Sequence, residues 1–424
     1  MEKEVIVIGS GISGLSVSNM LSTNFNVKVL ERADRIGGLI KCARVEGSLF
    51  HLVGGHVFNS RNQEVLDWFW NHFDRDSEFL KAIRNAKILF EGQIIGYPIE
   101  NYIHLLPEKM INKIVVELLN ITAEKKNAND SGDFKTFLQN SFGQTLYDLY
   151  FGPYNSKIWN TNLSEVPLEW LEGKLPMPKV AEIILSNILK KDEADMVHST
   201  FYYPVKDGSQ FIINRLARDL DISLSYHVNS IEYSEEKLSI NKGDLVSDTV
   251  VYCGDIRKLG DIIKIDDQDL TNALLNVRDL QSNGTSNVLC ETDETDLSWL
   301  YLPEEKFKAH RIIYTGNFSP TNNAGNIKTC VVEFSGKHDE KEMLEEIKLL
   351  PGNLKAISFN YEPNSYIIHR KDTKLKLKEL KENLQKYNIY LLGRFSEWEY
   401  FNMDKCIEGA MQLTKQLVEP LLLS

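Results

Sequence analysis

Residues 4–21 of the chain read EVIVIGSGISGLSVSNML, and this stretch indicates the fold class. The β-branched run before the glycines suits a buried parallel strand, and the residues after Gly14 suit a helix. Between them, Gly9 permits a tight turn, Gly11 lets the backbone approach a pyrophosphate, and Gly14 allows close packing of helix on strand. Because strand, glycine loop and helix follow in this order, we predict a dinucleotide-binding Rossmann unit rather than an isolated glycine-rich turn.

A second apolar run, residues 27–30, ends in Glu31, whose carboxylate can accept hydrogen bonds from a ribose. Residues 32–38 then combine arginines with a pair of glycines. This loop resembles the extended fingerprint of FAD-binding flavoproteins of the amine-oxidase type, which plain NAD dehydrogenases normally lack. The resemblance implies FAD rather than NAD as the cofactor.

The composition is that of an acidic globular protein. The 424 residues include 48 Lys+Arg and 60 Asp+Glu, a net charge of −12, which argues against non-specific nucleic-acid binding. No apolar run is long enough for a membrane span, and the N-terminus lacks the features of a signal peptide. The five cysteines are scattered without metal-ligand spacing, so we expect reduced thiols, no metal site and a cytoplasmic protein.

Hydrophobic periodicity predicts three units of α/β architecture. Helical patterns dominate between the fingerprint and residue 200, and strand patterns follow, among them residues 224–228. We expect a discontinuous, Rossmann-like FAD-binding domain at 1–75, 200–260 and 385–424. A mainly helical domain would occupy 76–199, and an antiparallel β-sheet substrate domain would occupy 261–384.

Several clusters outside the fingerprint combine residue types that suit a flavin and nucleotide site. Residues 52–58 place Gly54 and Gly55 beside His56, which would bring backbone close to a flavin ring. Aromatic residues also recur beside arginine or lysine, offering ring faces for a base and cations for a pyrophosphate. Taken singly, each aromatic residue is more often core than ligand contact. The blocks are 151–159, 170–174, 299–301 with Arg311, Tyr366 with Arg370, and 393–400.

These blocks, in this order, resemble the UDP-galactopyranose mutase family, most of all its eukaryotic type. The resemblance is patchy but spans the chain from Gly9 to Asp404, and it is most specific at 299–301, Arg311 and 393–400. It implies a GR2-type flavoprotein that interconverts UDP-galactopyranose and UDP-galactofuranose with reduced FAD. In that family the reaction runs through an adduct between flavin N5 and the sugar, and it supplies galactofuranose for surface glycans such as lipopolysaccharide.

The resemblance also implies roles for individual residues. The cofactor contacts would be Gly9, Gly11, Gly14, Glu31, Gly38, Gly55, Val228, Gly393 and Arg394. The substrate contacts would be Asn155, Trp159, Lys174, Trp299, Tyr301, Arg311, Tyr366 and Tyr400, and the catalytic set would be His56, Arg311, Lys174, Tyr366 and Tyr400. Two positions depart from the family: Lys174 replaces a second pyrophosphate-binding arginine, and Asp404 replaces an asparagine of eukaryotic members. Lysine keeps the charge but lacks the bidentate fork of arginine.

Two other functions stay open at this stage. One is an oxidoreductase of the amine-oxidase or protoporphyrinogen-oxidase type, although an apolar substrate has little use for Arg311 and Lys174 together. The other is a mutase-like protein that acts on another nucleotide sugar, a reading that Lys174 and Asp404 favour. NAD(P)H is one candidate reductant and a homodimer one candidate assembly, but the sequence fixes neither.

Overall fold

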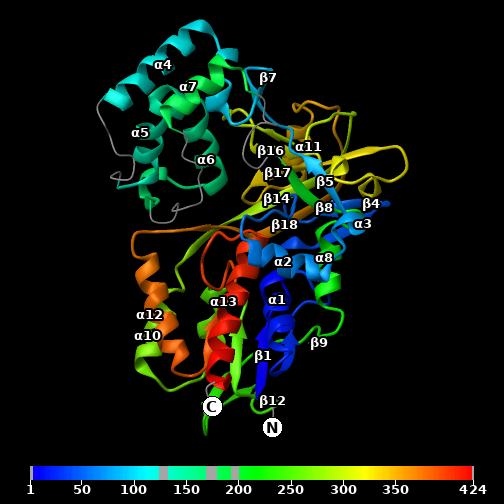
Figure 1. The fold of residues 1–424 in the computed structure, drawn as a ribbon, viewed down its shortest axis with the longest axis vertical. Helices are drawn as coiled ribbons and strands as arrows, with labels where there is room; N and C mark the ends of the chain where they lie inside the picture. The colour runs from blue at the N-terminus through cyan, green and yellow to red at the C-terminus, as the bar shows by residue number, and fades with distance from the viewer. Residues whose placement is uncertain (1–2, 124–131, 169–178, 192–199, 423–424) are drawn as a thin grey trace.

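Five parallel strands from three separate parts of the chain form the sheet in the lower half of Figure 1. The computed structural model describes residues 3–123, 132–168, 179–191 and 200–422. The strand order is β19 (Ile389–Leu391), β13 (Thr249–Tyr252), β1 (Glu4–Ile8), β2 (Asn26–Leu30) and β9 (Asp221–Ser223). All four pairings are parallel, as in a Rossmann unit.

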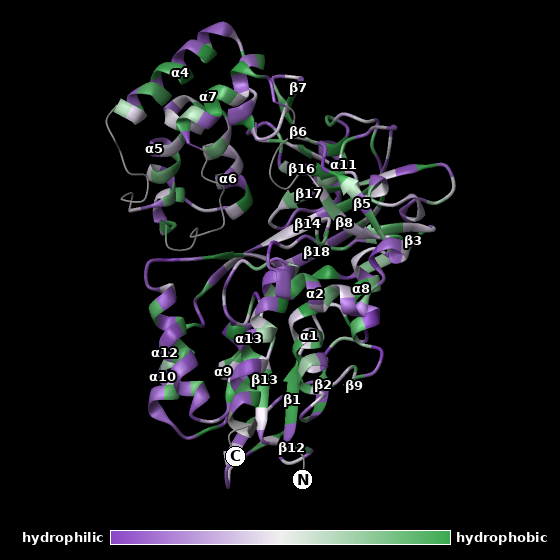
Figure 2. Ribbon diagram, in the orientation of Figure 1, coloured by the Kyte–Doolittle hydropathy of each residue, from purple (hydrophilic) through white to green (hydrophobic). Residues whose placement is uncertain are grey.

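Helices cover this sheet, because its strands are apolar on both faces. The helix after the fingerprint, α1 (Ile12–Leu21), packs against the C-terminal helix α13 (Met403–Leu422) and against α8 (Ser209–Leu216). Helices α10 (Gln268–Asn276) and α12 (Thr373–Gln385) pack together at one side. Figure 2 shows the apolar strand β1 in the lower half and many hydrophilic residues along α10 and α12.

A seven-stranded sheet forms the upper right part of Figure 1. Its order is β18 (Lys355–Ile368), β14 (Gln281–Thr292), β17 (Lys328–Ser335), β16 (Ala309–Ile313), β15 (Trp299–Tyr301), β6 (Ala86–Phe90) and β7 (Gln93–Gly96). Every neighbouring pair is antiparallel except β15 and β6, which run parallel. The α/β fold class with a largely antiparallel second sheet is confirmed.

The helical part lies at the upper left of Figure 1. Its main helices are α4 (Glu108–Ala123), α5 (Phe134–Leu146), α6 (Gly152–Trp159) and α7 (Val180–Ile188). Residues 79–96, within the range expected to be helical, instead form β5 (Phe79–Ile83), β6 and β7, and β5 pairs with β8 (Thr200–Pro204). The three domain ranges stay a prediction. Among the described residues, no helix is both long enough and apolar enough to cross a membrane.

One strand expectation was wrong. Residues 224–228 alternate in polarity but form a turn after β9, in which Ser225 has a positive φ of 53°. Tyr226 N donates to Glu31 O at 2.9 Å, so this turn lies beside the end of β2.

Candidate active site

The glycine loop after β1 has the tight geometry that the fingerprint predicts. Gly9 has a φ of +111°, and a Cβ on Gly14 would lie only 2.0 Å from Gly9 O. Gly11 is the N-cap of α1 and provides no side-chain cap, and the first turn carries no acidic residue. The first N–H groups of α1 therefore lack intrahelical partners and suit an anionic group such as a pyrophosphate.

Glu31 and the paired glycines lie against this loop. Glu31 is buried; its carboxylate accepts hydrogen bonds from Ser10 N at 2.9 Å and Ser10 Oγ at 2.6 Å. Gly37 N donates to Ser10 O at 3.1 Å, and a Cβ on Gly38 would lie 3.1 Å from Gly11 Cα. The acid at the end of β2 and both glycine loops thus form one cradle.

Gly393 and Val228 approach this cradle from distant parts of the chain. A Cβ on Gly393, which has a φ of +100°, would lie 2.6 Å from Ser13 Oγ on α1. Val228 packs against the hydrophobic cluster that contains Leu30, at the end of β2. The structure therefore brings Gly393 beside α1 and Val228 close to the end of β2, at the same end of the parallel sheet as the cradle.

A row of polar side chains crosses the seven-stranded sheet. Its members are direct cross-strand partners: Tyr301 with Arg311, Arg311 with Glu333, Glu333 with Asn287, and Asn287 with Asn360. Residues directly opposite on neighbouring strands share a face, so these five side chains, here called the Arg311 row, lie on one face.

Glu333 is at the centre of the Arg311 row. It was not among the site residues predicted from the sequence. Its Oε1 accepts hydrogen bonds from His310 Nε2 at 2.7 Å, Arg311 Nη2 at 2.7 Å and Tyr366 OH at 2.9 Å. Burial would raise the pKa of Glu333, but Arg311, His310 and these hydrogen bonds outweigh burial and hold it well below its usual range. The signal in the sequence was a single acid in the otherwise apolar run 330–334.

Hydrogen bonds between its backbone and two asparagine side chains hold the loop that carries His56 against the Arg311 row. Gly54 N donates to Asn287 Oδ1 at 3.3 Å, and Asn360 Nδ2 donates to Leu52 O at 2.7 Å. A Cβ on Gly54 would lie 2.8 Å from Glu333 Oε2, and a Cβ on Gly55 would lie 2.7 Å from the Ile313 side chain. Only glycines allow the loop to lie this close to the sheet.

His56 presents a neutral imidazole to the site. Burial above all, and then the positive charge of Arg394, lower the pKa of His56 to about 4. Its Nε2 is buried and has no hydrogen-bond partner among the described residues. A buried polar atom without a partner indicates a ligand that would supply one, so this observation fits a flavin or another polar ring bound beside His56.

Four predicted residues gather in an aromatic cluster next to the row. Trp159 meets Tyr366 and Tyr400 edge to face, with ring centroids 5.3 Å and 5.7 Å apart. Tyr366 and Tyr400 stack with centroids 5.8 Å apart, and the Arg394 guanidinium lies 4.6 Å from the centre of the Tyr400 ring. Since Tyr366 also lies 3.2 Å from Arg311 Nη2, the cluster is continuous with the Arg311 row.

Trp299 and Tyr301 lie around a second arginine, Arg84, which the sequence interpretation missed. Arg84 Nη2 donates to Tyr301 OH at 2.8 Å, and the guanidinium lies 5.3 Å from the centre of the Trp299 ring and 4.9 Å from that of Tyr97. Tyr301 therefore contacts Arg84 and is also the cross-strand partner of Arg311.

Three further positions singled out from the sequence are Asn155, Lys174 and Asp404. Asn155 Nδ2 donates to the backbone O of Phe151, the residue before α6, and Asn155 lies one turn before Trp159 on the same face of α6. Lys174 lies outside the described residues. Asp404 lies in the first turn of α13, where burial raises the pKa of its carboxyl and Ser60 contacts it.

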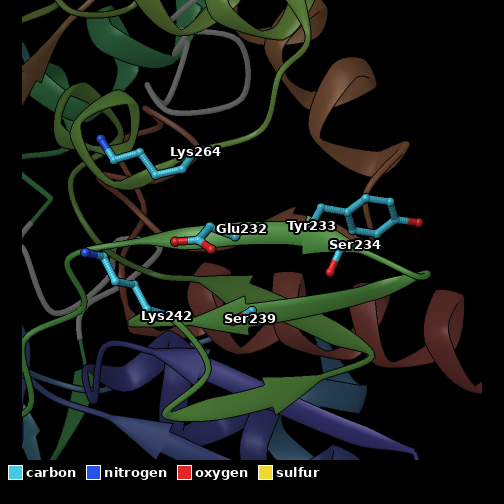
Figure 3. A pocket seen from close by; sticks show the side chains of 6 residues that line it. All are labelled: Glu232, Tyr233, Ser234, Ser239, Lys242 and Lys264. Atoms are coloured by element: carbon cyan, nitrogen blue, oxygen red, sulfur yellow. The ribbon is translucent and has the colours of Figure 1, made fainter.

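An open hollow of about 560 Å³ lies elsewhere, over the small sheet of β10 (Ile231–Ser234), β11 (Lys237–Ile240) and β12 (Leu245–Ser247), as Figure 3 shows. Two lysines, Lys242 and Lys264, and Glu232 line it, with none of the predicted site residues. The hollow is therefore separate from the candidate site.

The site as built combines a cradle for a dinucleotide with a fixed cation, tyrosine hydroxyls and a neutral histidine. Arg311 Nε is buried and has no hydrogen-bond partner among the described residues. Both hydrogen bonds that Arg311 makes to described side chains use Nη2, so Nη1 is left to bind a phosphate oxygen. The arrangement can bind a diphosphate and stabilise negative charge that develops on it.

Comparisons with known proteins agree with this architecture. The sequence model of the NAD(P)-binding Rossmann-like domain matches residues 7–73. A UDP-galactopyranose mutase of Mycoplasma genitalium is 23% identical over 98% of this chain and 95% of its own length. A dTDP-fucopyranose mutase of Escherichia coli is 27% identical over 41% of this chain and 46% of its own length.

Solved structures show the same fold. Reduced UDP-galactopyranose mutase superposes with a TM-score of 0.87 and 19% identity, covering 99% of this chain and 94% of that one. A protoporphyrinogen-oxidase-like protein of Exiguobacterium superposes with a TM-score of 0.76 and 14% identity, covering 98% of this chain and 99% of its own. The resemblance to the mutase family expected from the sequence is confirmed: the chain is homologous along almost its whole length to a protein named UDP-galactopyranose mutase, and it has the fold of a solved reduced UDP-galactopyranose mutase.

Proposed function

We propose that this protein is a flavin-dependent isomerase that interconverts UDP-galactopyranose and UDP-galactofuranose and supplies galactofuranose for surface glycans. The observation that carries the proposal is the Arg311 row, which joins a fixed guanidinium to the Trp159, Tyr366 and Tyr400 cluster beside a neutral His56. The match to a mutase of M. genitalium over almost the whole chain supports it. An oxidase of apolar substrates would have no need for this cation and these hydroxyls.

FAD is the proposed cofactor. Gly9, Gly11, Gly14, Glu31 and Gly38 would hold its pyrophosphate and ribose, since they form the cradle at the uncapped start of α1. Gly55, His56, Gly393 and Arg394 would lie beside its ring, and Val228 would contact it through the backbone. When bound and reduced, FAD supplies a nucleophilic ring nitrogen, which permits a ring contraction without net redox change.

The chain's own residues would bind and orient the nucleotide sugar. Arg311 would bind the diphosphate through Nη1, which has no hydrogen-bond partner among the described residues, and would stabilise the charge that grows on the diphosphate as the sugar–phosphate bond breaks. Tyr366 and Tyr400 would supply hydroxyl groups, and Lys174 would supply a second positive charge without a bidentate fork. The remaining substrate contacts would come from Asn155, Trp159, Trp299 and Tyr301. These residues would hold the substrate close enough for reaction.

A second candidate function is the same ring contraction on another nucleotide sugar. The similarity to a dTDP-fucopyranose mutase of E. coli favours it, although that match covers 46% of the E. coli protein. Lys174 also favours a changed substrate, because lysine holds phosphate less specifically than arginine.

The two candidates differ in which sugar nucleotide reacts. The purified protein, reduced with dithionite, is given UDP-galactofuranose and dTDP-fucofuranose separately, and products are followed by chromatography. The proposal predicts a higher kcat/KM for UDP-galactofuranose. A higher kcat/KM for dTDP-fucofuranose would transfer the assignment to the second candidate, and oxygen consumption with amine substrates but no isomerisation would favour the oxidoreductase. NADH and NADPH in place of dithionite would test both as reductants.

A further inference from the structure

Glu333 has a position that burial alone does not explain. It is the one acid in strand β17, it is 1% exposed, and both flanking residues Val332 and Phe334 are fully buried. A buried carboxylate is costly unless donors surround it. The donors here are His310, Arg311 and Tyr366, all on the single atom Oε1.

Glu333 contacts the Arg311 guanidinium through a single nitrogen, Nη2. Both hydrogen bonds that join Arg311 to described side chains use Nη2, which donates to Glu333 and to Tyr366 OH. Nε has no hydrogen-bond partner among the described residues, and the side chain is 22% exposed. Nη2 is therefore held by the protein, and Nη1, to which the described residues supply no hydrogen-bond partner, is left for a ligand.

His310 donates a hydrogen bond to Glu333 as a neutral imidazole and adds no second positive charge. Burial outweighs the nearby Glu333 carboxylate and lowers the pKa of His310, so its Nε2–H donates from an uncharged ring. The Arg311 and Glu333 charges thus form the only ion pair that the described part of the row contains.

We infer that Glu333 is a positioning residue for the nucleotide diphosphate, which acts by holding the guanidinium of Arg311 at a fixed angle. The inference rests on the proposed function, since it requires a diphosphate at Arg311. Glu333 also limits where the His56 loop can lie, because a Cβ on Gly54 would lie 2.8 Å from Glu333 Oε2 and 3.2 Å from Arg311 Nη2. One carboxylate therefore sets the distance between the arginine and the loop that carries His56.

A positioning role for Glu333 and the loss of its negative charge predict opposite changes in diphosphate affinity for Glu333→Gln. Removing a negative charge close to a bound diphosphate would by itself strengthen its binding. A positioning role predicts weaker binding, because a neutral amide holds the guanidinium less firmly and no longer opposes rotation of the fork. We expect the Kd for UDP to rise roughly tenfold in Glu333→Gln, and more in Glu333→Ala, the range for a lost charge-assisted hydrogen bond.

The experiment measures UDP and dTDP binding to the purified flavoprotein by isothermal titration, with the melting temperature of each variant recorded. Glu346→Gln is the matched control, because Glu346 is also buried and accepts hydrogen bonds from Lys308 N and Ala309 N, where β16 begins, but has no hydrogen bond with Arg311. Arg311→Ala and the double variant Arg311→Ala with Glu333→Gln complete a cycle. Since Glu333 acts through Arg311, the second substitution should cause no further loss of affinity in the Arg311→Ala background.

Three outcomes separate the possibilities. Weaker UDP binding in folded Glu333→Gln, absent from Glu346→Gln and from the Arg311→Ala background, supports the inference. Unchanged or tighter binding in folded Glu333→Gln overturns it, even if the wild type isomerises UDP-galactofuranose. Wild-type protein that neither isomerises nor binds either nucleotide overturns the proposed function and this inference together.

Discussion

Trp159, the last residue of α6, meets Tyr366 of β18 edge to face, with ring centroids 5.3 Å apart and an interplanar angle of 84°. Tyr400 joins the same cluster from the segment between β19 and α13. One aromatic cluster therefore connects the helical part, the seven-stranded sheet and the Rossmann part, and the proposed substrate site lies where all three meet.

Trp159→Ala should lower kcat/KM for UDP-galactofuranose by roughly tenfold to a hundredfold. The substitution removes two edge-to-face contacts, each worth about 0.5–1.5 kcal/mol, that hold Tyr366 and Tyr400 in place. Trp159→Phe keeps a ring at this position and should retain most of the activity. Steady-state kinetics of both variants tests this, and equal kinetics for Ala and wild type would remove Trp159 from the site.

Arg311→Ala should reduce kcat by about 100- to 1000-fold, the usual effect of losing one electrostatic donor to developing charge. Arg311→Lys should recover only part of this loss, because lysine keeps the charge without the fork. Arg278→Ala, which breaks an exposed ion pair with Asp261, is the control and should have near wild-type kinetics. Near-normal turnover of Arg311→Ala would contradict the assignment of the diphosphate to this residue.

Gly14→Ala should abolish flavin binding. An added Cβ would lie 2.0 Å from Gly9 O, so α1 must move away from β1 and the cradle must open. Gly260→Ala is the control, because its Cβ would meet only the Leu274 side chain at an ordinary 3.4 Å. The visible absorbance of the purified proteins reports the flavin; a yellow, fully loaded Gly14→Ala protein would show that the cradle does not hold it.

Glu100 should make the stability of the protein depend on pH. Burial raises the pKa of its carboxyl to about 7, above the unfolded value of about 4.3. A raised folded pKa contributes stability that is fully present below pH 4 and is lost as the pH rises through 7. Over this window the loss is at most about 3–4 kcal/mol.

Chemical unfolding of wild type and Glu100→Gln at pH 5 and pH 8 measures this contribution. The glutamine variant should become more stable relative to wild type as the pH rises. Glu382→Gln, at an exposed position on α12, is the control and should run parallel to wild type. Parallel pH profiles for Glu100→Gln and wild type would show that Glu100 is not the titrating group.

The sequence predicted most of the fold because its signals are local. Residues 4–31 carry strand, glycine loop, helix, strand and acid in a fixed order, and the structure reproduces each of them. The turn at 224–228 was mistaken for a strand because alternating polarity does not exclude a tight turn with a residue at positive φ.

The candidate site was predictable only where its residues belong to recognisable blocks. Trp159, Tyr366, Tyr400 and Arg394 come from blocks that carry the family resemblance, and the structure places them together, while their roles stay a prediction. Glu333 and Arg84 were missed because their roles depend on which strands are neighbours. The pairing of β16 with β17 sets Glu333 opposite Arg311, and no local pattern in either strand specifies that register.

The most direct test of the account is the turnover of UDP-galactofuranose by one protein preparation, measured before and after reduction with dithionite. The account predicts that UDP-galactopyranose forms after reduction and that little or none forms before it. A reduced, flavin-loaded protein that leaves UDP-galactofuranose unchanged would contradict the proposed function while leaving the fold and its cradle as described.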